Sequence, residues 1–152
     1  MLEQQRWDKK KEEYPIATEV WLYMKNLGWN DYVCAGIMGN LMAETGGRTL
    51  NLQPTLSTNL YYGMCQWSKA YDEVWYTDLI TQCNFLRDTI EYEFNTFGFK
   101  YQKGFNYESF LKMKNTEEAC LAFAKCYERC AEWTYPIRQT SAVKAYDYFI
   151  NN

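Results

Sequence analysis

The 152-residue chain contains no histidine, and this absence removes several kinds of chemistry. Histidine-containing zinc sites and catalytic triads with a histidine base both depend on the imidazole ring. Six cysteines are present, but no two have the Cys-x-x-Cys spacing of a structural zinc site. We therefore expect no metal and no cofactor, and we expect the cysteines to be reduced thiols. The sequence alone leaves open the alternative of a disulfide that uses Cys83 or Cys120.

Positive charge and long apolar runs are also scarce. The chain has 16 Lys and Arg against 19 Asp and Glu, for a formal net charge of −3. Nucleic-acid binding draws on a basic stripe that neutralises phosphates, and no such stripe is present, so we expect no nucleic-acid partner. No apolar stretch approaches the length of a membrane span, and the N-terminal residues lack the pattern of a signal peptide. The sequence therefore predicts no membrane span and no signal peptide.

What the chain does contain is enough apolar material for one core, since 47% of its residues are hydrophobic. Helical periodicity and capping residues dominate, which predicts a mainly α single domain of about six to eight helices. Residues 1–13 read as a charged N-terminal segment or linker, and residues 14–152 as the domain. Residues 48–62 lack helical period and are expected to form a loop with at most a short hairpin. The helices are expected over residues 15–27, 31–45, 78–97, 106–113, 115–130 and 137–149, and the core is expected to include Trp75, Phe85, Phe123 and Trp133.

The most informative residue is Glu44, in the last turn of the helix predicted over residues 31–45. The rest of this helix is mostly apolar, and Gly36 and Gly39 would let another helix approach closely. Apolar surroundings and the negative end of the helix dipole both disfavour a charged carboxylate, so they raise the pKa of Glu44. A raised pKa is what a general acid needs near neutral pH. The simpler alternative is a helix-terminal glutamate that reaches solvent.

A second informative segment, residues 59–68, joins an amide to a cluster of aromatic residues. Gln66 offers amide donors and an acceptor, which suit an N-acetyl group or a sugar hydroxyl. Tyr61, Tyr62 and Trp67 are candidates for the walls of a sugar groove, and Asn59 is a further candidate for substrate binding. Gln66 has an equally good alternative role as an amide that caps the loop.

The Glu44 segment and Tyr62-Gly63-Met64-Cys65-Gln66-Trp67 together resemble the phage tail lysozyme domains. This branch of the lysozyme superfamily lies near the goose-type lysozymes and the soluble lytic transglycosylases. These relatives carry a helix-terminal glutamate followed by a Gly-Leu-Met-Gln type motif, and here Met64 and Cys65 stand where Leu and Met often occur. The resemblance covers roughly residues 14–150 and implies a lysozyme-like fold with a loop or small hairpin as one wall of the cleft. It also implies cleavage of the β-1,4 bond between N-acetylmuramic acid and N-acetylglucosamine in peptidoglycan, with Glu44 as the catalytic acid.

Glycosidases commonly use two carboxylates, and the second one is not obvious here. No Asp or Glu occurs between Thr45 and Gln66. Asp72 is the tentative second carboxylate, with Glu73 and the distant Glu128 as other candidates. For Asp72 the alternative is a solvated charge in the first turn of a helix. A lytic transglycosylase needs no second carboxylate, because groups of the sugar itself assist and an anhydro-sugar is released.

Three functions therefore stay open: a muramidase, a lytic transglycosylase that uses the same Glu44, and a non-catalytic glycan-binding domain. In each case the expected partner is the glycan strand of peptidoglycan. The negative net charge gives no electrostatic attraction to an anionic wall, so other domains of a larger phage lysin or tail protein are expected to deliver it. We expect synthesis in the host cytoplasm and action on the bacterial cell wall, either on the virion or after release.

Overall fold

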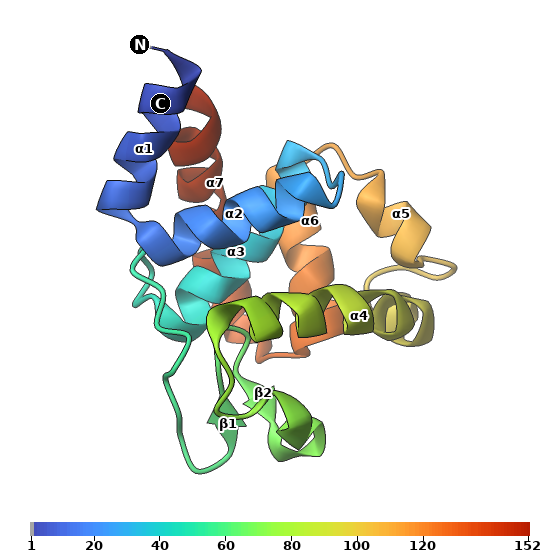
Figure 1. The fold of residues 1–152 in the computed structure, drawn as a ribbon. Helices are drawn as coiled ribbons and strands as arrows, with labels where there is room; N and C mark the ends of the chain where they lie inside the picture. The colour runs from blue at the N-terminus through green and yellow to red at the C-terminus, as the bar shows by residue number, and fades with distance from the viewer. Residues whose placement is uncertain (1) are drawn as a thin grey trace.

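Helix α3, Asp31–Thr45, runs through the middle of the computed structural model, which describes residues 2–152 (Figure 1). The side chain of Asn30 begins it by accepting a hydrogen bond from the backbone N–H of Val33. Eleven of its fifteen residues are buried, and its most extensive contacts are with α7 and α6. The helix predicted over residues 31–45 is therefore confirmed, as is its burial on most sides.

The prediction of a mainly α fold with one small hairpin is also confirmed. Proline at the first helical position begins α2, while Asp78 and Asn115 cap α4 and α6 with their side chains. The other helices and strands are α1 (Glu3–Glu13), α2 (Pro15–Asn26), β1 (Tyr61–Tyr62), β2 (Trp67–Ser68), η1 (Lys69–Val74), α4 (Leu79–Phe97), η2 (Gly98–Lys100), α5 (Tyr107–Leu111), α6 (Thr116–Phe123), η3 (Ala124–Glu128), η4 (Glu132–Thr134), α7 (Tyr135–Tyr146) and η5 (Asp147–Asn151).

Two glycines of α3 allow α6 and α7 to pack directly on its backbone. A Cβ atom on Gly36 would lie 2.6 Å from the backbone nitrogen of Cys120 in α6. A Cβ atom on Gly39 would lie 2.6 Å from the Cβ atom of Ala142 and from the carbonyl oxygen of Arg138, both in α7. The small residues predicted to permit close helix contact therefore do so, and α3 is fixed between two later segments of the chain.

Replacing Gly39 by alanine is expected to destabilise the protein by about 1–3 kcal/mol, because the added methyl group must push α7 away from α3. Urea unfolding followed by circular dichroism measures this change. Gly104→Ala is the control: no atom lies within 4 Å of its Cβ position, so only its positive φ of 81° opposes the substitution. Equal stability of Gly39→Ala and the unchanged protein would show that the two helices can separate without cost.

The sequence predicts a charged segment or linker over residues 1–13, whereas the structure forms helix α1 from Glu3 onward. This helix lies against the C-terminal turn: Arg6 Nε donates to the carbonyl oxygen of Asn152 at 2.9 Å, and Lys10 Nζ donates to that of Tyr148 at 2.5 Å. Trp21 of α2 stacks on Phe149 of the same turn, with ring centroids 4.5 Å apart. A domain boundary at residue 14 stays a prediction.

The hairpin lies below the helices in Figure 1 and is the only sheet in the described part of the chain. Tyr61 pairs with Ser68 and Tyr62 with Trp67 in antiparallel register. The preceding loop joins it through a bridge between Ser57 and Tyr62. Residues 48–62 thus contain a loop and one short strand, in agreement with the sequence-based expectation.

The core predictions are correct for Phe123 and wrong for Trp133. Phe123 is fully buried, and Trp75 and Phe85 are half-buried against the core. Trp133 is 74% exposed because it lies in η4, a short turn in which no residue is buried. All six cysteines are free thiols, and five of them are buried. Among the described residues, no helix is both long and apolar enough to cross a membrane.

Candidate active site

Glu44 lies one residue before the end of α3, and its side chain is 15% exposed. The Arg138 guanidinium comes from α7, and its Nη2 lies 2.6 Å from Glu44 Oε1. The Arg138 side chain is only 6% exposed, so the two charges form an ion pair that is mostly removed from water. Glu44 is thus the more accessible member of the pair, and a ligand reaches the carboxyl before it reaches the guanidinium.

Arg138 is held in place by side chains on both sides. Its Nη1 donates to Asn40 Oδ1 at 3.0 Å, and its Nε donates to Thr134 Oγ1 at 3.0 Å. The amide nitrogen of Asn40 in turn donates to the carbonyl oxygens of Gly36 and Cys120. Asn40 and Glu44 are one helical turn apart, so both face the guanidinium. Their polar i, i+4 pairing within an apolar helix is the sequence signal that points to a buried partner such as Arg138.

The second acidic side chain at this site is Glu128, the last residue of η3. Its carboxyl lies next to the carboxyl of Glu44 and the thiol of Cys65. Although the residue as a whole is half-buried, Glu128 Oε1 is sealed from solvent and has no hydrogen-bond partner among the described residues. Buried polar atoms are rarely left in this state, so the position of this oxygen calls for a physical explanation.

Burial governs the ionisation of both carboxyls. It raises the pKa of Glu128 well above the ordinary value, and the neighbouring charge of Glu44 raises it further. Burial also raises the pKa of Glu44, against the opposing charge and hydrogen bond of Arg138. The raised pKa expected for Glu44 from its position on α3 is therefore present, and its main cause is loss of water around the carboxyl.

The hairpin beside the carboxyls is tied together by two glutamines. Gln66 has a positive φ of 53°, and its Nε2 donates to the carbonyl oxygens of Leu56 and Gly63. Its amide nitrogen therefore holds the loop, as in the capping alternative. No sequence motif singles out the second glutamine, Gln82 of α4. Its Oε1 accepts from the Met64 N–H at 2.8 Å, and its Nε2 donates to the carbonyl oxygen of Pro54 at 2.7 Å.

The site thus combines a helix-terminal glutamate with a hairpin that two glutamines hold in place. A family model described as phage tail lysozyme matches residues 15–149. The chain belongs to the phage tail lysozyme family. Neither the curated proteins nor the solved structures yield a match. As a member of this family, the chain has a lysozyme-like role in lysis of the cell wall, with peptidoglycan as its substrate.

The aromatic residues of the hairpin are not equally available to a substrate of this lysozyme-family domain. Tyr62 and Trp67 are buried, and the indole N–H of Trp67 donates to the hydroxyl of Tyr127 at 2.9 Å. Tyr61 is 45% exposed. Of the three predicted groove residues, only Tyr61 presents a large free surface, while Trp67 fixes the hairpin to the helical part of the domain.

Asn59 and Asp72 are both exposed and share a surface hollow of about 610 Å³ with Trp75 and Tyr76. Lys69 and the hydroxyl residues of the 57–58 turn complete this hollow. The acidic neighbour of Glu44 is thus Glu128, whereas Asp72 belongs to the hollow on η1. The assignment of Asp72 as a second carboxylate stays a prediction without support from its position.

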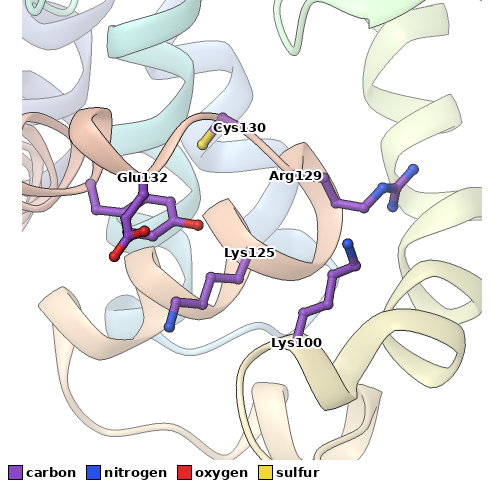
Figure 2. Close-up of a pocket in the computed structure, with 6 residues that line it drawn as sticks. Lys100, Lys125, Arg129, Cys130 and Glu132 are labelled. Carbon is purple, nitrogen blue, oxygen red and sulfur yellow. The ribbon is translucent and has the colours of Figure 1, made fainter.

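Figure 2 shows a separate basic hollow of about 290 Å³, which Glu44 does not line. Lys100, Lys125 and Arg129 supply its positive charge, and Glu132 supplies one negative charge. Arg129 is already neutralised, because its Nη1 lies 2.6 Å from Glu93 Oε2. The hollow therefore presents the ammonium groups of Lys100 and Lys125, the latter over the Tyr135 ring, and it does not include Glu44 or Glu128.

Proposed function

We propose that the protein is a peptidoglycan glycosidase of the muramidase type, which cleaves the β-1,4 bond between N-acetylmuramic acid and N-acetylglucosamine. Glu44 is its general acid. The observation that supports this role is a carboxyl with a raised pKa at the solvent-facing edge of a buried site. A raised pKa favours delivery of a proton near neutral pH, and the exposed edge lets this carboxyl touch the glycosidic oxygen.

Glu44 transfers its proton to the glycosidic oxygen as the bond from that oxygen to C1 breaks and the sugar gains oxocarbenium character. The exposed ring of Tyr61 and the side chain of Asn59 are the proposed contacts for the sugar, on the hairpin and the loop before it. Gln66 contributes by holding this wall in shape. Residues 14–152 form the proposed catalytic unit, which acts with other domains of a phage lysin or tail protein.

A lytic transglycosylase is the second candidate, and one observation favours it. Retaining glycosidases separate their two carboxyls by about 5–5.5 Å and inverting ones by about 6.5–9.5 Å, which leaves room for the sugar or for a water molecule. Glu128 lies directly against Glu44, and Asp72 lies in another hollow. Neither has the placement of a separate nucleophile or base, so the sugar's own acetamido and hydroxyl groups are the proposed assistants.

Digestion of purified peptidoglycan, followed by mass spectrometry of the products, tests this proposal. We expect disaccharide-containing fragments whose muramic acid ends are either reducing, after hydrolysis, or anhydro, after transglycosylation. The anhydro product would make the protein a transglycosylase with Glu44 in the same role. Absence of any cleavage, with retained binding to the glycan, would instead identify a non-catalytic lysozyme-like domain.

A further inference from the structure

We propose that Glu128 is a positioning residue that stores the proton which Glu44 delivers to the glycosidic oxygen. The inference rests on the proposed function of Glu44 and explains why a second carboxyl is buried in direct contact with it.

The surroundings of Glu128 favour a protonated carboxyl. Its Oε1 is sealed from solvent without a hydrogen-bond partner, and a carboxylate in that position would leave a charged oxygen unsatisfied. A carboxylic acid avoids this cost and provides an O–H donor. Its other polar side-chain contact among the described residues is the Cys65 thiol. Burial raises the pKa of this thiol well above the usual range, so that group is neutral.

The cations at the site are arranged so that negative charge is favoured on Glu44. Arg138 donates to Glu44 at 2.6 Å and to Asn40 and Thr134, and among the described residues no hydrogen bond joins it to Glu128. Arg129 follows Glu128 directly in the chain, but it adopts the left-handed conformation and pairs with Glu93. The proton of the pair therefore resides on Glu128 and the charge on Glu44, next to Arg138.

The remaining titratable groups that face the two carboxyls do not compete for this proton. Burial raises the pKa of the Cys130 thiol, and it raises the pKa of the Tyr127 phenol well above its usual value. Both groups therefore stay neutral near neutral pH. Arg138 and Arg129 keep their positive charge, because their pKa values are raised from an already high reference value. Glu44 and Glu128 are therefore the two groups that exchange a proton as pH changes.

The proton count closes over one turnover. Glu128 passes its proton to Glu44, and Glu44 transfers a proton to the glycosidic oxygen as the C1–O bond breaks and its electron pair goes to that oxygen. The attacking hydroxyl, from water or from the sugar itself, loses one proton when it bonds to C1. That proton returns to the carboxyl pair, so neither an oxidant nor another acid is needed.

The substitution Glu128→Gln tests the proposal, because an amide of the same shape can donate a hydrogen bond to Glu44 but cannot supply a proton. The pair then lacks the proton that Glu128 holds to higher pH, so the alkaline limb of the pH profile for peptidoglycan cleavage is expected to move to lower pH. We expect roughly tenfold lower activity near neutral pH and activity within about twofold of the unchanged protein under acidic conditions. Glu132→Gln, an exposed carboxyl four residues away, is the control and should leave the profile unchanged. An unshifted profile in Glu128→Gln, or an equal loss at every pH, would overturn the proposal.

A measurement without substrate separates this proposal from the proposed function. Carboxyl ¹³C NMR of glutamate-labelled protein should show Glu44 and Glu128 titrating in two coupled steps, whereas Glu44 in Glu128→Gln should show a single step without the one at higher pH. Unchanged titration of Glu44 in that variant would refute proton storage even if peptidoglycan is cleaved. If the coupled titration is found but no peptidoglycan is cleaved, the proposed function fails while the shared proton stands.

Discussion

Glu44→Gln is expected to reduce the rate of peptidoglycan cleavage by about 10²–10⁴-fold, the usual contribution of a general acid. The amide keeps the size of the carboxyl, and its oxygen still accepts the hydrogen bond from Arg138 that Glu44 accepts at 2.6 Å. It cannot give a proton to the leaving oxygen. The initial rate of fragment release from purified peptidoglycan measures the loss, and circular dichroism should show an unchanged helix content.

The matched control is Asp72→Asn, which removes an exposed carboxyl from the hollow on η1. We expect activity within about twofold of the unchanged protein, since a surface substitution away from the reacting atoms has little effect. Undiminished cleavage by Glu44→Gln would show that Glu44 is not the general acid. A large loss in Asp72→Asn alone would instead restore Asp72 as the second carboxylate.

Arg138→Met is expected to destabilise the protein by about 3–5 kcal/mol near neutral pH, because it leaves buried carboxyls without their cation. The methionine retains apolar volume but loses the hydrogen bonds to Glu44, Asn40 and Thr134. Chemical unfolding at neutral and acidic pH measures the effect. The exposed pair of Arg87 with Asp88 offers the control Arg87→Met, for which a change within about 0.5 kcal/mol is expected.

The pH dependence of the Arg138→Met defect has a definite sign. Without the guanidinium, the pKa values of Glu44 and Glu128 rise further above those of the unfolded chain, since burial no longer meets an opposing positive charge. The folded state then binds more protons than the unfolded state, so stability falls as pH rises from the ordinary glutamate range through the folded pKa values. The defect should therefore shrink on acidification. A defect of equal size at both pH values would mean that lost packing, rather than uncompensated charge, is its cause.

The local structure around Glu44 follows from its sequence neighbourhood. The apolar pattern of residues 31–45 predicts a buried helix with a carboxyl in its last turn. The meeting of that carboxyl with Glu128 could not be derived in the same way. Periodicity describes one segment at a time, and nothing in residues 115–130 indicates which element their polar face will meet.

Two other residues show where residue type alone is insufficient. Gln66 suits a sugar and a backbone carbonyl equally well, and its left-handed conformation and two carbonyl acceptors are properties of the folded loop. Trp133 looks like a core residue because it is large and apolar. The left-handed conformation of Arg129 ends the helical segment before it, and Trp133 then falls on a turn with no buried position.

The contact between α1 and the C-terminal turn brings the two ends of the described chain together, as Figure 1 also shows. Arg6 reaches the carbonyl oxygen of Asn152, so a short flexible bridge could join the ends without disturbing either helix. New ends could then be opened in an exposed turn such as the one at Gly104, which has free space around it. The architecture therefore lends itself to circular permutation, with the helices that surround the two glutamates kept in their present arrangement.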